Sequence, residues 1–126
     1  MPKILIADDE PHIRLLLEQT LEDFEEAGVE IITADNGLDA LDVIRNERPE
    51  LVYLDVMMPG MNGFEVCNTV KNELGIDGVY IVMLTAKGQE LDKVKGSDVG
   101  ADIYMTKPFN PDRIIDKTAE VLKIQL

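Results

Sequence analysis

Carboxylate side chains follow two apolar runs, and their types and positions suggest a shared chemistry. KILIA is followed by Asp8, Asp9 and Glu10, and LVYL is followed by Asp55. If the two runs form neighbouring strands, Asp8, Asp9 and Asp55 converge. Three carboxylates in one crevice repel one another, which either raises a pKa or requires a cation. Because no His or Cys accompanies them, all-oxygen ligation favours Mg²⁺.

Two further predicted strand ends carry groups that suit a phosphoryl ligand. One apolar run ends at Thr85, whose hydroxyl can donate a hydrogen bond to a phosphoryl oxygen. The last run leads into Lys107, which can supply a compact positive charge. With a bound cation these parts form a phosphoryl-transfer site, where catalysis is mainly positioning and charge neutralisation. Asp55 is then placed to accept a phosphoryl group as an aspartyl phosphate.

The residues after Asp55 predict a tight turn. Pro59, Gly60 and Gly63 follow it within eight positions, and these residue types permit a sharp change of chain direction. Such a loop could aim the main-chain carbonyl of Met57 at the metal. The turn therefore gives the candidate site a possible ligand that is not a carboxylate.

Each of these residues, taken alone, has a plainer structural explanation. Asp8 and Asp9 could favour a helix N-terminus that has Pro11 in its first turn, and in isolation that explanation is the favoured one. Thr85 could cap a helix, and Lys107 could be a solvated loop charge. Their joint placement at strand ends makes coincidence a poor explanation.

Five apolar runs alternate with stretches of helical period, which predicts an α/β fold. The runs are KILIA (3 to 7), EIITA (30 to 34), ELVYLD (50 to 55), VYIVML (79 to 84) and DIYMT (102 to 106). Strands that alternate with helices pair in parallel through right-handed crossovers. KILIA, LVYL and YIVML lack polar alternation, as expected of central strands that helices cover on both faces. Functional groups in such sheets collect at the carboxyl ends of the strands.

Four of the helical stretches present an apolar face at helical spacing. The four faces are Ile13, Leu16, Leu17, Leu21 and Phe24; Leu38, Leu41 and Ile44; Phe64, Cys67, Val70 and Leu74; and Ile114, Ile115, Val121 and Leu122. The remaining stretch, QELDKVKGSDVG at 89 to 100, has few apolar anchors and an internal Gly96, which costs about 1 kcal/mol in a helix. We expect it to be the most mobile helix. Cys67 is predicted to be a buried thiol rather than a nucleophile.

Length and charge limit the classes of protein that the chain can belong to. At 126 residues and 14.1 kDa it predicts one domain, residues 1 to 126, that needs no disulfide or structural metal to fold. The net charge of −13 repels phosphate backbones, so direct nucleic-acid binding is not expected. The N-terminus resembles neither a signal peptide nor a membrane span, which predicts a cytoplasmic protein without membrane contact. We favour a stand-alone protein over an excised domain.

Four segments together resemble the receiver domain of two-component response regulators. ILIADDE, LVYLDVMMPGMNGFE, VMLTA and GADIYMTKPF stand in that family's order, and the resemblance covers essentially all of the chain. It implies a doubly wound five-stranded parallel sheet of order 2-1-3-4-5 in a flavodoxin-like three-layer sandwich. It also implies that Asp55 is the phosphoacceptor, that Asp9 binds Mg²⁺ directly, that Asp8 acts mainly through a metal-bound water, and that the Met57 carbonyl is a further ligand.

The same resemblance implies roles for residues that follow the phosphoacceptor. Thr85 would bind a phosphoryl oxygen, and Lys107 would pair with the phosphoryl group. Tyr104 matches the aromatic switch that turns inward when Thr85 moves toward the phosphate. The Lys107-Pro108 peptide bond is expected to be cis.

The resemblance also implies partners. The phosphoryl donor would be a sensor histidine kinase or a phosphotransfer protein, and the output would reach an output domain or a target protein through the face formed by residues 89 to 100, the strand 102 to 106 and the last helix. The chain would be no enzyme beyond its own phosphoryl transfer and autodephosphorylation. Homodimerisation on phosphorylation is possible. The salt bridges typical of receivers in winged-helix transcription factors are not expected, because Ile103, Arg113 and Lys117 stand at those positions.

Three other functions compete with this interpretation. A phosphatase of the haloacid dehalogenase type also uses an Asp nucleophile, but it needs a second Asp two residues later, where this chain has Met57. A degenerate receiver that is never phosphorylated typically lacks an acid or the lysine, and this chain keeps them all. A flavodoxin-type FMN binder is disfavoured, because ADDE after the first strand would repel the cofactor phosphate.

Overall fold

The computed structural model describes residues 1 to 86 and 100 to 126. Its strands are β1 (Lys3–Ala7), β2 (Glu30–Ala34), β3 (Leu51–Asp55), β4 (Tyr80–Ala86) and β5 (Ile103–Lys107). Its helices are α1 (Pro11–Thr20), α2 (Glu22–Glu26), α3 (Gly37–Glu47), α4 (Gly63–Asn68), the π-helix η1 (Thr69–Glu73) and α6 (Pro111–Leu122). The helix expected over residues 89 to 100 lies, apart from Gly100, outside the described residues. Within the described ranges, no helix has the length and apolar character needed to cross a membrane.

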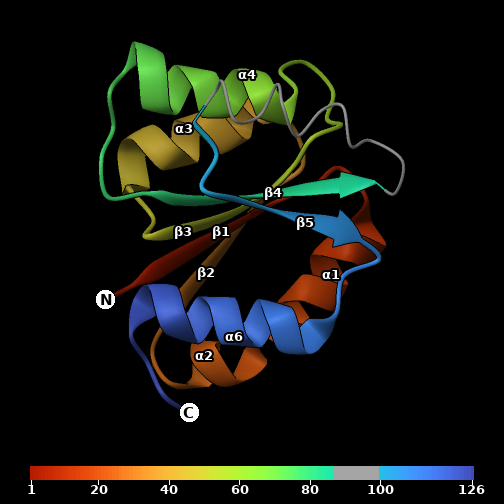
Figure 1. Ribbon diagram of the computed structural model, residues 1–126, viewed down its shortest axis with the longest axis vertical. Helices are drawn as coiled ribbons and strands as arrows, with labels where there is room; N and C mark the ends of the chain where they lie inside the picture. The colour runs from red at the N-terminus through yellow and green to blue at the C-terminus, as the bar shows by residue number, and fades with distance from the viewer. Residues whose placement is uncertain (87–99) are drawn as a thin grey trace.

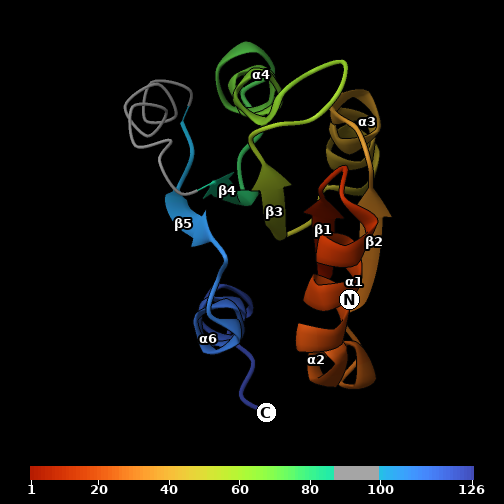
Figure 2. The same ribbon diagram turned by 90° about the vertical axis from the view of Figure 1, so that its right-hand side faces the viewer.

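The five strands form one parallel sheet in the order β2-β1-β3-β4-β5. Figures 1 and 2 show α3 and α4 on one face of this sheet and α1, α2 and α6 on the other. The predicted α/β class, the three layers and the order implied by the resemblance are therefore confirmed. The three runs without polar alternation are β1, β3 and β4, and all three are internal strands, as predicted.

Among the described residues, two apolar clusters, one on each face of the sheet, make up the core. Alternate strand residues supply them, since Val52 and Leu54 of β3 join the cluster under α3 and α4, whereas Leu51 and Tyr53 join the one under α1 and α6. The residues alternate between the clusters because successive side chains of a strand point to opposite faces of the sheet. Both faces of β3 are thus apolar, and its final residue, Asp55, interrupts that pattern.

Three leucines that the helical pattern placed on buried faces are exposed. Leu16 is 43% exposed in the middle of α1, while Leu17 of α1, Leu21 between the two helices and Phe24 of α2 are buried. Leu38 is 58% exposed in the first turn of α3. The predicted faces were wrong at these two positions.

The third exposed leucine, Leu74, follows from an irregular helix. The chain continues from α4 into a π-helical turn, in which the Leu74 N–H donates to the Thr69 carbonyl oxygen at 2.8 Å, five residues back. The wider turn changes the angle between successive side chains, so a face predicted from α-helical spacing no longer holds. Leu74 is 47% exposed, while Phe64, Cys67 and Val70 are buried as predicted.

A buried polar network joins β3 to α6. The Tyr53 hydroxyl donates to the Ile114 carbonyl oxygen at 3.1 Å and lies 2.7 Å from the hydroxyl oxygen of Thr118. The Thr118 hydroxyl also lies 2.7 Å from the Ile114 carbonyl oxygen. Buried polar groups must be paired, so this network specifies how α6 lies against the strand that ends in Asp55.

The single cysteine is expected to be chemically inert in the folded protein. Burial, with a smaller contribution from the charge of Asp102, raises the pKa of Cys67 to about 12 against the opposing charge of Lys71. The thiolate is the reactive form, so at pH 8 only about one molecule in ten thousand would carry it. Reaction with a chromogenic disulfide at pH 8 should be undetectable over an hour and complete within minutes in guanidinium chloride. Rapid labelling of the folded protein would contradict the buried position.

Candidate functional site

Lys107 brings together carboxylates from two strands at the carboxyl edge of the sheet. Its Nζ lies 2.7 Å from Asp8 Oδ2, 3.2 Å from Asp55 Oδ1 and 3.9 Å from Glu10 Oε1. Asp8 follows β1 and Asp55 ends β3, and these two strands are neighbours in the sheet. The structure therefore confirms the predicted convergence of Asp8 and Asp55. Lys107, which the sequence placed at the end of a more distant strand, joins them.

The order of the strands explains how Lys107 reaches this position. It is the last residue of β5, which is separated from β3 by β4 and lies at the edge of the sheet. Because all strands are parallel, their last residues lie along one edge, on the right in Figure 1. The long lysine side chain extends along that edge to the two carboxylates. The Lys107-Pro108 peptide bond that follows is cis, as the resemblance implied.

Burial and mutual charge set the protonation of these groups. Asp8 is fully buried, and Asp55 is 4% exposed. Burial first, and then the negative charge of Asp8, raise the pKa of Asp55 to about 6, although Lys107 acts in the opposite direction. Burial acts to lower the pKa of Lys107, but the hydrogen bond to Asp8 and the charge of Asp55 outweigh it, and the pKa is raised. Lys107 thus stays protonated beside an aspartate that ionises near pH 6.

The acidic residues after β1 fit a hard divalent cation. Carboxylate oxygens of Asp8, Asp9 and Glu10 all lie within 4.8 Å of one another. Asp9 and Glu10 also line a cavity of about 300 Å³ together with Asp55, Met57, Ala86 and Lys107. This donor set contains oxygen and no nitrogen or sulfur ligand, which is the set that Mg²⁺ prefers. Of the predicted ligands, Asp55 lines the same cavity without belonging to the group of mutually close carboxylates.

Glu10 is a member of this site that sequence reasoning missed. It was noted as the third acid after the first strand, but no role was given to it. In the structure its two carboxylate oxygens lie 3.9 Å from Lys107 Nζ and 3.4 Å from His12 Nε2. Its position directly after Asp9 could have indicated this. His12, in contrast, is exposed at the start of α1, consistent with giving it no role.

The loop after Asp55 packs closely on the end of β3. The Gly63 N–H donates to the Val56 carbonyl oxygen at 2.9 Å, and the Gly37 N–H donates to the Pro59 carbonyl oxygen at 3.4 Å. Met57 is 61% exposed and lines the cavity. The loop therefore closes tightly where the turn residues predicted. Coordination of a metal by the Met57 carbonyl stays a prediction.

Thr85 and Tyr104 lie on the neighbouring strands β4 and β5. Thr85 is buried in β4, one residue before its end, and pairs in register with Thr106 of β5. Tyr104 is half-buried and packs against the apolar cluster on the α3 and α4 face. Ala86, which follows Thr85, lines the cavity. The strand positions thus agree with the predicted placement, and the roles in phosphoryl binding and switching stay predictions.

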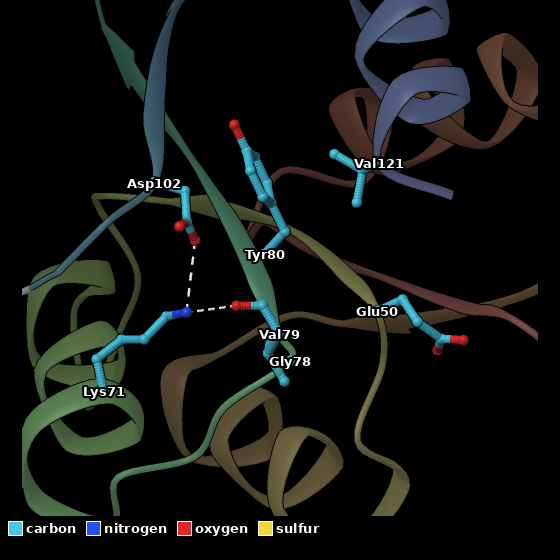
Figure 3. Close-up of a pocket in the computed structure, with 7 residues that line it drawn as sticks. All are labelled: Glu50, Lys71, Gly78, Val79, Tyr80, Asp102 and Val121. Atoms are coloured by element: carbon cyan, nitrogen blue, oxygen red, sulfur yellow. Dashed lines mark hydrogen bonds and ion pairs between the residues drawn. The ribbon is translucent and has the colours of Figure 1, made fainter. Parts of the chain in front are cut away.

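A second cavity, of about 330 Å³, lies near the amino ends of β4 and β5 (Figure 3). The Lys71 ammonium donates to the Val79 carbonyl oxygen there and lies 3.5 Å from Asp102 Oδ2. Asp102 in turn accepts a hydrogen bond from the Ile81 N–H at 2.7 Å. These contacts fix the start of the two strands at the edge opposite to the carboxylates. None of the predicted site residues lines this cavity.

The sheet order and the acidic cavity at the carboxyl ends of its strands define a doubly wound, flavodoxin-like α/β domain. The chain belongs to the response regulator receiver domain family, whose model matches residues 4 to 119. A phosphorylated aspartate and bound Mg²⁺ are general features of this family, which serves two-component regulatory systems.

Curated relatives and solved structures agree with this assignment. The chain is 43% identical over 121 residues to the alkaline phosphatase synthesis transcriptional regulatory protein PhoP of Bacillus subtilis, covering 96% of this chain and 48% of that protein. It is 44% identical to the phosphate regulon transcriptional regulatory protein PhoB of Pseudomonas aeruginosa, covering 95% and 51%. The structure of the chemotaxis response regulator CheY4 of Vibrio cholerae aligns with a TM-score of 0.82 at 36% identity, covering 96% of this chain and 98% of that one. The chain thus spans about half the length of these curated relatives.

Proposed function

We propose that this domain is a phosphorylation-activated switch of a two-component phosphorelay, with Asp55 as its phosphoacceptor. The donor is a phosphohistidine on a sensor histidine kinase or on a phosphotransfer protein. The observation that carries the proposal is the Lys107 ammonium held between Asp8 and Asp55, at 2.7 and 3.2 Å, on the wall of an open acidic cavity. A cation in that place can offset the charge of an incoming phosphoryl group.

Asp55 performs the covalent step. One of its carboxylate oxygens attacks phosphorus, the new P–O bond forms as the P–N bond to histidine breaks, and the leaving imidazole takes a proton from solvent. With a pKa of about 6, Asp55 is mostly ionised, and so nucleophilic, at neutral pH. Lys107 then pairs with the phosphoryl group, and the Thr85 hydroxyl donates to one of its oxygens. Later attack by water on phosphorus breaks the P–O bond to Asp55, releases inorganic phosphate and restores the carboxylate. We propose no other enzymatic activity.

The residues that would hold Mg²⁺ are the predicted set, with Glu10 beside them. Asp9 and Asp55 would bind the ion directly, Asp8 would act mainly through a metal-bound water, and the Met57 carbonyl would be a further ligand. When bound, the ion supplies a divalent charge that offsets phosphoryl oxygens. Asp8 already accepts hydrogen bonds from Lys107 at 2.7 Å and from the Glu10 N–H at 2.9 Å, which suits an indirect role.

The output is a change of shape on the side of the sheet that includes β5 and α6. Tyr104 of β5 would turn inward when Thr85 moves toward the phosphoryl group. This movement would favour the arrangement of the β5 and α6 surface that a target recognises. The helix expected over residues 89 to 100 would belong to the same face. Names of the relatives PhoP and PhoB suggest transcriptional control as the process.

The partners follow from the charge and from the surface of α6. The net charge of −13 disfavours DNA contact by this domain, so an output domain or target protein would make that contact in the cytoplasm. A homodimer on phosphorylation would have to differ from the salt-bridged type. Lys117 pairs instead with Glu120 at 2.7 Å and lies 5.7 Å from the ring centre of Tyr80.

Incubation with acetyl phosphate and Mg²⁺, followed by intact mass spectrometry after a fast quench, tests the proposal. We expect the wild-type protein to gain one phosphoryl group, and Asp55→Asn or removal of Mg²⁺ with EDTA to abolish the gain, because the acceptor or the charge compensation is lost. Asp42→Asn, at an exposed acid on α3, is the matched control and should be phosphorylated normally. Absence of a phosphoryl group on the wild-type protein would favour a pure interaction module.

A further inference from the structure

Arg14 contacts both ends of the acidic segment Asp8 to Glu10. Its guanidinium Nη1 donates to the Asp8 carbonyl oxygen at 2.8 Å, and its main-chain N–H donates to the Glu10 carbonyl oxygen at 3.1 Å. The residue lies in the first turn of α1 and is half-buried. The main-chain contact is an ordinary bond of the first helical turn, whereas the guanidinium contact ties α1 back to the end of β1.

The remaining polar atoms of Asp8 are also partnered. Its N–H donates to the Ala34 carbonyl oxygen at 3.1 Å, while its two carboxylate oxygens accept from the Glu10 N–H and from Lys107. Lys107 contacts the carboxylate of Asp8. Arg14, a permanent cation, contacts only the Asp8 main-chain carbonyl oxygen and, among the interactions described, no carboxylate of this segment. Arg14 therefore adds positive charge and a fixed loop shape without using an oxygen that a metal needs.

Arg14 also lines a small polar cavity next to β2, the strand on the other side of β1 from β3. This cavity, of about 270 Å³, is lined by Arg14, Thr33, Ala34, Asp35 and Asp39. The aspartates at the end of β2 and the start of α3 add negative charge to this cavity. The side chain thus lies beside residues of β2 and α3 as well as on its own helix α1.

We propose that Arg14 is a positioning residue for cation binding, which holds the Asp8 to Glu10 segment in the shape that presents its carboxylates to Mg²⁺. This inference rests on the proposed function, because it takes the acidic cavity as the Mg²⁺ site. Three carboxylates within 4.8 Å repel one another and would spread apart in a loop that is free to move. The hydrogen bond from the Arg14 guanidinium to the Asp8 carbonyl oxygen opposes that spreading before the ion arrives.

The direction in which Mg²⁺ affinity changes when Arg14 is replaced distinguishes a positioning role from a purely electrostatic one. A positive charge near a cation site repels the cation, so removing Arg14 should strengthen Mg²⁺ binding if the residue acts only through its charge. If it positions the loop, removing it should weaken binding despite the gain in electrostatic attraction. Arg14→Met removes the donor and the charge, whereas Arg14→Lys keeps the charge and one donor.

Isothermal titration calorimetry of the unphosphorylated protein with MgCl₂, which measures the Kd for Mg²⁺, tests the inference. We expect Arg14→Met to raise the Kd for Mg²⁺ roughly 10-fold, as is typical when a partner of a metal ligand is lost. Arg14→Lys should restore the Kd to within about 3-fold of wild type, since one donor remains. Arg45→Met, at an exposed arginine on α3, is the matched loss of one positive charge and should not weaken binding.

Phosphorylation by acetyl phosphate over a range of Mg²⁺ concentrations supplies a second readout. The Arg14→Met variant should need about 10-fold more Mg²⁺ for half-maximal rate yet reach the wild-type rate at saturation, because Asp55 and Lys107 are intact. Circular dichroism checks its fold, and Arg14→Leu, which likewise removes the donor and the charge, replaces it if it is unfolded.

Two results would overturn the inference in distinguishable ways. If the wild-type protein binds Mg²⁺ and the Arg14→Met variant binds it equally tightly or more tightly, the positioning role alone is overturned. A wild-type protein that binds no Mg²⁺ would also overturn the cation part of the proposed function.

Discussion

The Gly63→Ala variant is expected to lose about 3 kcal/mol of folding free energy and most of its phosphorylation rate. A methyl group at this position would lie 3.0 Å from the Asp55 carbonyl carbon and from Val56 Cα, and closer still to the Asp55 carbonyl oxygen. These are main-chain atoms, so no side-chain rotation can relieve the contact. Either the end of β3 or the start of α4 must move.

The same collision bears on function because Asp55 carries the reacting oxygen. A shift of its main chain would move the carboxylate relative to Lys107, now 3.2 Å away. Misplacement of reacting groups by about 1 Å can cost 100-fold in rate, and we expect at least about 10-fold here. Urea unfolding and the initial rate of phosphorylation by acetyl phosphate measure the two effects.

Gly75→Ala is the matched control for this variant. Gly75 has a φ of +60°, and an added methyl group would meet no atom within 4 Å. That substitution should cost about 1 kcal/mol through backbone strain and leave the phosphorylation rate unchanged. If Gly63→Ala proved no more destabilising than Gly75→Ala, the close packing of the loop against β3 would be wrong.

The Asp55→Asn variant is expected to be more stable than the wild type by about 3 kcal/mol at pH 8 in the absence of divalent cations. Burial and the charge of Asp8 raise the pKa of Asp55 to about 6, so the folded protein holds a proton that the unfolded chain has already released. Ionising this carboxylate in the folded state therefore costs free energy. An amide of the same shape avoids that cost.

The pH dependence has a definite sign. Because the folded pKa is raised, the contribution of Asp55 to stability is most favourable below the unfolded pKa, near 4, and is lost as pH rises through about 6. The advantage of Asp55→Asn should therefore fall to about half when the pH is lowered from 8 to 5. Urea unfolding at both pH values, in EDTA, measures it.

The exposed Asp42→Asn substitution serves as the control for charge removal alone, and its effect should be small at both pH values. A destabilised Asp55→Asn variant at pH 8 would mean that the ion pair with Lys107 outweighs the cost of burying Asp55.

The positions of the strands, and which of them are internal to the sheet, could be predicted from the sequence. Each run that lacked polar alternation became an internal strand, and the predicted strand ends lie within two residues of the observed ones. This succeeded because burial on both faces leaves a direct record in residue type. The carboxyl-edge rule for parallel sheets then placed Asp8, Asp55 and Lys107 along one edge. The strand order itself came from the family resemblance, since apolar patterns do not identify neighbours.

Helix packing was predicted less well. Leu16, Leu38 and Leu74 each fit an apolar face but are exposed. The ends and breaks of helices depend on what they pack against. The break between α1 and α2 and the π-helical turn of η1 carry no clear signal in a periodic pattern. Spacing therefore identified most of the buried helical residues and failed at these three leucines.

For this protein, the sequence alone determined the fold class, the central strands and the set of acids and lysine that make up the candidate site. Those features depend on residue type and on local period, which a chain carries before it folds. Only the tertiary structure decided that Lys107 lies between Asp8 and Asp55, that Glu10 joins the acidic cluster, and that Arg14 ties α1 back to the end of β1. Such contacts join residues through the packing of whole elements, so no local pattern determines them.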